Sequence, residues 1–148
     1  MQVVLIYTDG AARGNPGPSA SGYKIYNSER EMMVEAESYN GIQTNNFAEY
    51  NAVVLALEWC KANLYSPEDA EINVNSDSEI VVRQLNGRYR VRSGSLLKMN
   101  TRVRELVRTF GAVRFANVPR ENPEIVKVDA ALNVLLDDIA ESNNNLKK

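Results

Sequence analysis

The pattern of apolar positions predicts strands first and helices later. A continuous β-branched apolar run over residues 3–7 is typical of a central strand covered on both faces. Two further strands are expected over 23–26 and 32–38, joined by the polar turn 27–30. Three consecutive strands with short links favour an antiparallel meander.

Helical periodicity begins at Phe47 and then alternates with short strands. The expected order is a helix over 47–64, a strand over 72–75, a helix over 76–85, a basic loop over 88–95, a helix over 96–110, a strand over 112–118 and a helix over 126–141. A meander followed by such alternation predicts an α/β fold, a mixed five-stranded sheet flanked by helices. Residues 1–141 are expected to form one domain and residues 142–148 a disordered polar tail.

Composition matters mainly for the classes of protein that it excludes. No apolar run among the 148 residues is long enough for a transmembrane helix, and the first residues lack the basic segment of a signal peptide. A cytoplasmic location without membrane contact is therefore expected. The absence of histidine excludes Ser-His-Asp and Cys-His catalysis, and the single Cys60 excludes an internal disulfide and a cysteine-rich zinc site. A metal held by oxygen ligands would suit this chain.

The basic residues are concentrated in one segment although the net charge is −2. Residues 83–108 carry eight basic residues and one acid, against 9 basic and 18 acidic residues elsewhere. A basic segment of this kind is the electrostatic footprint expected of a protein that binds a phosphate backbone. A solvated helix face and loop explains the charges equally well.

Four acids stand near the ends of the expected elements. They are Asp9, Glu49, Asp77 and Asp129. Sites in sheets flanked by helices tend to form where strand ends and helix starts converge. Each acid also has a structural explanation: a turn at Asp9-Gly10, a capping pair of Glu49 with Asn46, and a favourable helix N-terminus for the other two. The pattern alone does not show that the four converge.

Two local patterns receive a structural interpretation. Ser76-x-x-Glu79 has the form of a capping box, so Glu79 is expected to be structural. Residues 11–18, rich in Gly, Pro and Asn, are expected to form a loop. Because no strand is expected within two residues of Gly10, a tight hairpin is not expected there.

Four loop motifs occur in order along the chain: TDG-xxx-GNPG, TNN-xx-E, SDS, and VPR-xx-N followed by an Asp. With these motifs, roughly residues 3–140 resemble type 1 ribonuclease H. Arg120 in place of a histidine and the short basic loop after Gly87 resemble the archaeal-type branch. The resemblance implies a ribonuclease H-like fold and cleavage of the RNA strand of an RNA/DNA hybrid, leaving 3′-hydroxyl and 5′-phosphate ends.

The resemblance also implies two divalent metal ions, Mg²⁺ or Mn²⁺ as a substitute. It assigns their ligands to Asp9, Glu49, Asp77 and Asp129, with Asp9 as the bridging carboxylate. Two hard cations about 4 Å apart can hold the attacking and leaving oxygens of a phosphodiester in line. No side-chain general base is then required, which agrees with a chain that lacks histidine.

Substrate contacts are implied for loop residues and for arginines. The expected substrate-binding residues are Gly10, Asn15, Thr44, Asn45, Asn46, Arg88, Arg90, Arg92, Arg120 and Asn122. In related enzymes the loop asparagines and threonine contact the DNA strand, while 2′-hydroxyls mark the RNA strand. Arginines would add phosphate contacts and salt dependence. Ordinary turn and cap chemistry remains the alternative for the asparagines, and Thr44 could be a plain loop residue.

The chain departs from the family pattern at three places. Asn122 and Asp129 lie seven positions apart rather than about four, which suggests a longer loop containing Pro123 and leaves Glu124 as the alternative ligand. Glu79 stands where related enzymes usually carry a glutamine near the hybrid. Arg120 replaces the mobile-loop histidine, and it either binds a phosphate or is a surface ion-pair residue.

Two other functions compete with the hybrid nuclease. One is a binding module for hybrids or structured RNA, against which the retention of all four acids argues. The other is a DNA nuclease on the same scaffold, against which the GNPG and TNN loops argue. A monomer without an obligate protein partner is expected.

Overall fold

Strand β1 (Gln2–Ala12) lies at the centre of a five-stranded sheet in the computed structural model, which describes residues 2–146. It pairs antiparallel with β2 (Gly17–Asn27), which pairs antiparallel with β3 (Met32–Gln43). On its other side β1 pairs parallel with β4 (Ala70–Ser76), which pairs parallel with β5 (Ala112–Asn117). The strand order β3-β2-β1-β4-β5 confirms the expected mixed α/β sheet.

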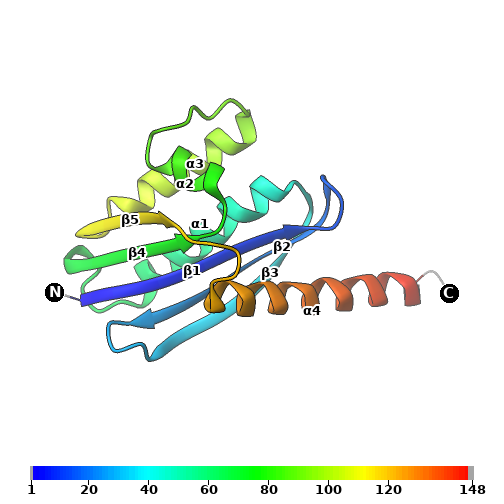
Figure 1. Ribbon diagram of the computed structural model, residues 1–148, viewed down its shortest axis with the longest axis horizontal. Coiled ribbons are helices and arrows are strands. Elements are labelled where there is room, and N and C mark those ends of the chain that lie inside the picture. The colour runs from blue at the N-terminus through cyan, green and yellow to red at the C-terminus, as the bar shows by residue number, and fades with distance from the viewer. Residues whose placement is uncertain (1, 147–148) are drawn as a thin grey trace.

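Helices cover both faces of the sheet (Figure 1). The helical elements are α1 (Asn45–Asn63), the 3-10 turn η1 (Pro67–Asp69), α2 (Glu79–Leu85), α3 (Gly94–Val107) and α4 (Pro123–Leu146). The larger core contains α1 and α3, and it buries Val4 and Ile6 of β1 completely. Among residues 2–146, no helix combines the length and apolar character that a membrane span needs.

A second, smaller core joins α4 to the opposite face of the sheet. It consists of Ala20, Val128, Leu132 and Leu136, with Ala11 and Leu135 packed against it. A Cβ atom at Gly22 would lie 2.8 Å from Cδ2 of Leu132 and 3.1 Å from Cγ1 of Val128. The glycine in β2 therefore allows α4 to approach the sheet closely.

The first hairpin corrects the expectation of a loop over 11–18. β1 continues to Ala12, which pairs with Ser19 of β2, so that only residues 13–16 connect the two strands. The ladder is closed by the Arg13 amide, which donates to the Pro18 carbonyl at 2.8 Å. Backbone hydrogen bonds continue through small residues that carry no apolar alternation, and this explains why the pattern underestimated the strands.

The start of α4 corrects the expectation of a longer loop around Pro123. The helix begins at Pro123 rather than Val126, since the Asn122 side-chain oxygen accepts from the amides of Glu124 (3.0 Å) and Ile125 (3.4 Å). Proline is well suited to the first helical position because its missing N–H needs no partner there. The additional residues between Asn122 and Asp129 are therefore helical.

The end of α4 corrects the expectation of a disordered tail. The helix continues past Glu141 to Leu146, because residues 142–146 contain neither glycine nor proline to end it. Lys147 and Lys148 lie outside the described residues.

The start of α2 corrects the expected capping box. Ser76 is the last residue of β4, and Ser78 caps α2 by accepting from the Val81 amide at 3.4 Å. Glu79 is instead paired with Arg83 one turn later, at 2.9 Å. Asp77 therefore lies between the end of β4 and the residue that caps α2.

Candidate active site

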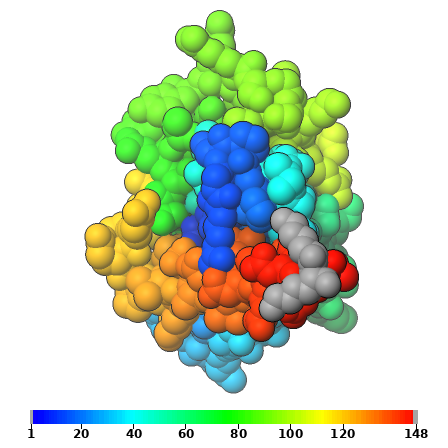
Figure 2. Space-filling view, turned by 90° about the vertical axis from the view of Figure 1, so that its right-hand side faces the viewer, coloured from blue at the N-terminus to red at the C-terminus, as the bar shows by residue number. Residues whose placement is uncertain are grey.

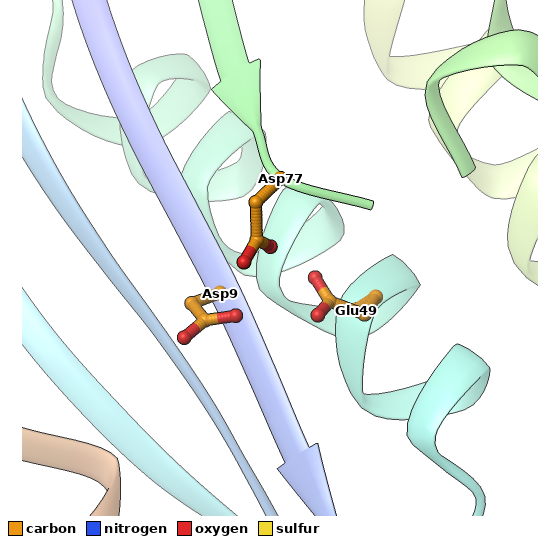
Figure 3. Close-up of side chains that lie close together, drawn as sticks. All are labelled: Asp9, Glu49 and Asp77. Atoms are coloured by element: carbon orange, nitrogen blue, oxygen red, sulfur yellow. The ribbon is translucent and has the colours of Figure 1, made fainter. Parts of the chain in front are cut away.

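Three of the four expected acids meet at one point of the structure (Figure 3). Asp9, Glu49 and Asp77 each offer a carboxylate oxygen within 4.8 Å of the others. Asp77 directly follows β4, and Glu49 lies in the first turns of α1. Asp9 was expected to end its strand, but β1 continues to Ala12. Asp9 directly follows Thr8, the last β1 residue that pairs with β4. The side of β1 left open where β4 ends is where the carboxylates gather.

The approach of α1 to β1 depends on Gly10. A Cβ atom there would lie 2.3 Å from the carbonyl carbon of Ala48 and 2.4 Å from the Glu49 nitrogen. Such distances exclude a side chain unless the backbone moves. Gly10 therefore brings the start of α1 against the strand that carries Asp9, and it lines the cavity itself.

Thr44, rather than Asn46, caps this helix. Its hydroxyl oxygen accepts from the Phe47 amide at 3.1 Å, which satisfies one of the free amides of the first turn. The alternative of a capping pair between Asn46 and Glu49 is therefore wrong. Glu49 Oε2 is buried and has no hydrogen-bond partner among residues 2–146.

The cluster is electrostatically unfavourable without a cation. Asp9 is only 5% exposed, and burial, together with the negative charge of Asp77, raises its pKa to about 7. Burial and the neighbouring Asp9 raise the pKa of Glu49 well above its usual value. Burial also raises the pKa of Asp77, although the Arg120 guanidinium opposes the rise.

These residues fit a hard divalent cation. The donor set consists of carboxylate oxygens, which Mg²⁺ and Mn²⁺ prefer, and it includes the unpartnered oxygen of Glu49. A bound cation would favour the charged form of each acid and reverse the rise in pKa. Buried acids held this close together are otherwise costly to the fold.

Asp129 lines the same cavity but stands outside the cluster of three. The cavity has a volume of about 500 Å³ and contains all four acids in its wall. Asp129 is exposed on α4, and its Oδ2 accepts from Asn133 at 3.3 Å. The alternative ligand, Glu124, does not line the cavity, and its carboxylate is bound to Tyr26 and Lys127. The structure therefore favours Asp129 over Glu124 as the fourth carboxylate.

Two of the asparagines expected to bind substrate, Asn15 and Asn45, link the β1–β2 hairpin to the start of α1. The side-chain oxygen of Asn45 accepts from the Ala12 amide at 2.9 Å, and that of Asn15 accepts from the Asn45 amide at 3.0 Å. The side-chain oxygens of Asn15 and Asn45 thus have the structural role that was the alternative to substrate binding. Neither Nδ2 group has a partner within residues 2–146, so both remain available as donors. Asn45 and Asn46 line the cavity, whereas Asn15 is exposed on the hairpin loop.

The arginines lie in two different places. Arg88, Arg90 and Arg92 are exposed on the loop between α2 and α3 and do not line the cavity. Figure 2 shows the β1–β2 hairpin (blue) between this green segment and α4 (orange to red) on one face. Arg120 does line the cavity, with a side chain 90% exposed and Nε 4.0 Å from Asp77 Oδ2. Arg120 thus lies at the limit of ion-pair distance from Asp77, and phosphate binding by this residue stays a prediction.

The remaining predicted residue, Asn122, is the α4 cap and does not line the cavity. Five lining residues were not singled out from the sequence: Ala11, Ala12, Ser78, Ile125 and Val126. The SDS motif contained a signal for Ser78. No local pattern marked Ile125 and Val126, because the start of α4 was expected too late.

Comparison with known proteins assigns the chain to a family. The family model described as RNase H matches residues 1–117, a range that ends before Arg120 and Asp129. Ribonuclease HI of Halobacterium salinarum is 37% identical over 135 residues, 91% of this chain and 65% of that protein. Bifunctional protein Rv2228c of Mycobacterium tuberculosis is 32% identical over 118 residues, 79% of this chain and 31% of that protein. The chain therefore spans less than two thirds of these curated relatives.

Solved structures extend the likeness to the whole fold. The N-terminal RNase H domain of Rv2228c superposes with a TM-score of 0.86 at 30% identity, covering 97% of this chain and 99% of that one. LC11-RNase H1, solved in complex with an RNA/DNA hybrid, gives a TM-score of 0.86 at 33% identity, with coverage of 93% and 99%. Together with the three converging acids, these matches show that the chain belongs to the ribonuclease H family.

Proposed function

We propose that this chain is a metal-dependent endonuclease that hydrolyses the RNA strand of RNA/DNA hybrids. The observation that carries the proposal is the cluster of Asp9, Glu49 and Asp77 in an open cavity. Family membership supports it, as does the hybrid bound to the structural neighbour LC11-RNase H1. The chain is proposed to act as a monomer.

The four carboxylates of the cavity wall would hold two Mg²⁺ ions, with Mn²⁺ as a substitute. When bound, such ions hold the attacking and leaving oxygens of the phosphodiester in line and lower the pKa of the attacking water, leaving 3′-hydroxyl and 5′-phosphate ends. Asp9 would be the shared ligand, as the resemblance to type 1 ribonuclease H implies, and it lies within reach of both other acids of the cluster. Glu49 would contribute its unpartnered Oε2.

The other residues of the face would bind and orient the hybrid. The Nδ2 groups of Asn15 and Asn45 are proposed to donate to the DNA strand, while Arg120 exchanges its contact with Asp77 for an RNA phosphate. The arginines of the α2–α3 loop would add phosphate contacts further along the duplex.

The direct test is cleavage of an RNA/DNA hybrid with a labelled RNA strand, in Mg²⁺, Mn²⁺ or EDTA. Wild-type protein is compared with Asp77→Asn, which removes one cluster charge while keeping the size of the side chain. We expect metal-dependent cleavage of the RNA strand alone and a loss of at least about a hundredfold in the variant, the scale of a lost electrostatic contact in the transition state.

Single-stranded RNA, duplex RNA and duplex DNA serve as control substrates. Binding of the hybrid without cleavage in either metal would overturn the nuclease and leave the binding module. Cleavage of duplex DNA would instead indicate the related DNA nuclease.

A further inference from the structure

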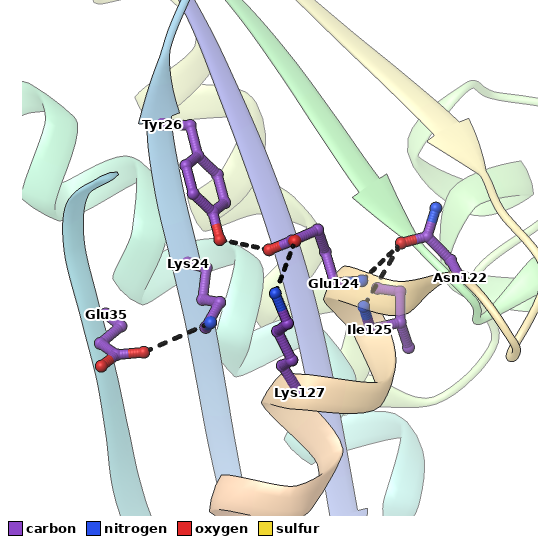
Figure 4. Close-up of polar contacts among 7 residues, drawn as sticks. All are labelled: Lys24, Tyr26, Glu35, Asn122, Glu124, Ile125 and Lys127. Atoms are coloured by element: carbon purple, nitrogen blue, oxygen red, sulfur yellow. Dashed lines mark hydrogen bonds and ion pairs between the residues drawn. The ribbon is translucent and has the colours of Figure 1, made fainter. Parts of the chain in front are cut away.

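Glu124 and Asp129 lie on different sides of α4. Because successive residues of an α-helix are turned by about 100°, positions five apart differ by roughly 140° around the axis. Asp129 lines the metal cavity together with Ile125 and Val126. Glu124 does not line this cavity, and its carboxylate points toward Tyr26 of β2 (Figure 4). When α4 is rotated so that Glu124 bonds to Tyr26, Asp129 is therefore turned toward the cavity.

Tyr26 and Glu124 form an anchor between β2 and the first turn of α4. The Tyr26 hydroxyl donates to Oε2 of Glu124, and Lys127 Nζ lies 3.3 Å from Oε1. The Tyr26 ring packs edge-on against Tyr7, with centroids 6.1 Å apart. Burial and the Glu124 bond raise the pKa of Tyr26 to about 12. The hydroxyl therefore remains a donor across the working pH range.

The first turn of α4 has few other ties to the sheet. Within residues 2–146, polar side-chain contacts join α4 to the strands or the hairpin at two places only. One is Tyr26–Glu124, and the other is Arg13, which contacts Asn133 and Asp137 further along the helix. Asn122 caps the helix but does not attach it to a strand. Ile125 is buried but Val126 is 52% exposed, so apolar packing holds only part of this turn.

Helix α4 must also hold Asp129 against repulsion. Asp129 lines the same cavity wall as Asp9, Glu49 and Asp77, so it faces three other carboxylates. A hydrogen bond to a carboxylate is stronger than one between neutral groups, and it constrains both the rotation and the axial position of the helix.

We propose that Tyr26 and Glu124 are positioning residues that hold Asp129 at the metal cavity and thereby set the affinity for Mg²⁺. This inference rests on the proposed function, because it assumes that Asp129 is a metal ligand. Neither residue lines the cavity in which the metal would bind, so both would act through the position of α4.

The test is Tyr26→Phe, which keeps the ring against Tyr7 and removes only the hydroxyl. We expect the dissociation constant for Mg²⁺ alone, measured by calorimetry without substrate, to rise three- to tenfold. At saturating Mg²⁺ the variant should keep kcat within twofold of wild type and leave KM for the hybrid unchanged.

Three further variants separate positioning from general stability. Glu124→Ala should weaken Mg²⁺ binding as Tyr26→Phe does, whereas Glu124→Gln keeps an oxygen that accepts from Tyr26 and should bind Mg²⁺ nearly as wild type. Tyr23→Phe on the same strand is the matched control, because its hydroxyl has no hydrogen-bond partner within residues 2–146. It should bind Mg²⁺ as wild type.

Two results would overturn this inference but not the proposed function. The first is a Tyr26→Phe protein with a lower Tm and a wild-type Mg²⁺ affinity, which would make the anchor merely structural. The second is equal weakening by Glu124→Gln and Glu124→Ala. In both cases wild-type hybrid cleavage would leave the proposed function standing. A wild-type chain that binds no Mg²⁺ and cleaves no hybrid would overturn both.

Discussion

The clustered carboxylates oppose the stability of the metal-free fold. Burial and Asp77 raise the pKa of Asp9 from 3.8 to about 7, so the folded state binds this proton more tightly than the unfolded chain does. The contribution of Asp9 to stability is therefore most favourable below pH 4. It is lost progressively as the pH rises through about 7.

Asp9→Asn removes this charge and should stabilise the metal-free protein at high pH. A pKa rise of about three units corresponds to roughly 4 kcal/mol, so we expect the variant to exceed wild type by about 2–4 kcal/mol at pH 8 in EDTA. The difference should vanish toward pH 4. Urea unfolding at a series of pH values measures it.

The exposed Asp138, which has no ion pair within residues 2–146, provides the control. Asp138→Asn should leave the pH dependence as it is in wild type. Mg²⁺ should raise the stability of the wild-type protein more than that of Asp9→Asn. An Asp9→Asn protein less stable than wild type at pH 8 would show that burial and the neighbouring acids do not destabilise the charged Asp9 carboxylate.

Among the elements, α1 and β1 make the close approach that assembles the cluster. Gly10→Ala would place a Cβ atom 2.3 Å from the backbone of Ala48, so one of the two elements must move. We expect a loss of about 1–3 kcal/mol in stability from overpacking. Because Glu49 moves with its helix, hybrid cleavage should fall by about a hundredfold, the scale of a 1 Å misplacement.

Chemical denaturation and the cleavage assay measure the two effects of Gly10→Ala separately. Gly94→Ala is the control, since a Cβ atom there meets no atom within 4 Å. It should keep full activity and gain up to about 1 kcal/mol from the better helix propensity of alanine. Full activity in Gly10→Ala would contradict the close approach as the reason for the glycine.

The order and type of the main elements were predictable, whereas several boundaries were not. Apolar periodicity identified the meander and the alternating part because each element buries one recognisable face. It missed the ends of β1 and β2, where ladder hydrogen bonds continue through Ala, Gly and Ser residues. It also placed the start of α4 too late, because the Asn122 cap and Pro123 carry no apolar signal.

Prediction of the site had a similar limit. The motifs identified Asp9, Glu49 and Asp77, and the structure brings these three together. The motifs could not show that Thr44 caps α1, or that Asn15 and Asn45 link the hairpin to the helix. Such bonds depend on which backbone amides come within reach after folding, and local sequence does not specify this.

At the scale of the whole molecule, the acids and the basic loop lie in different places, and under the proposed function they would have separate tasks. The carboxylates gather where β4 ends beside β1, while Arg88, Arg90 and Arg92 are exposed on the α2–α3 loop outside the cavity. Because none of these arginines lines the cavity, we expect their charges to contact the backbone of a long duplex rather than the reacting phosphate. Binding and chemistry should therefore be separable by substitution.

Replacing all three loop arginines with alanine tests this separation. Each phosphate contact contributes about 0.7–0.9 to the slope of log K against log salt, so the slope for hybrid binding should become shallower by roughly 2–3. At saturating hybrid, kcat should stay within about twofold of wild type, because the loop provides uniform binding. Binding is measured by anisotropy in Ca²⁺ at a series of salt concentrations.

Arg114→Ala is the control, because Arg114 pairs with Glu71 beside a separate surface cavity whose lining residues include none of the four acids. It should leave the salt slope as it is in wild type. If the triple variant also keeps the wild-type slope, the loop makes no phosphate contact, and its charges form only a solvated surface. If instead kcat falls with the slope unchanged, the loop acts on the chemistry, and the separation of binding from catalysis is wrong.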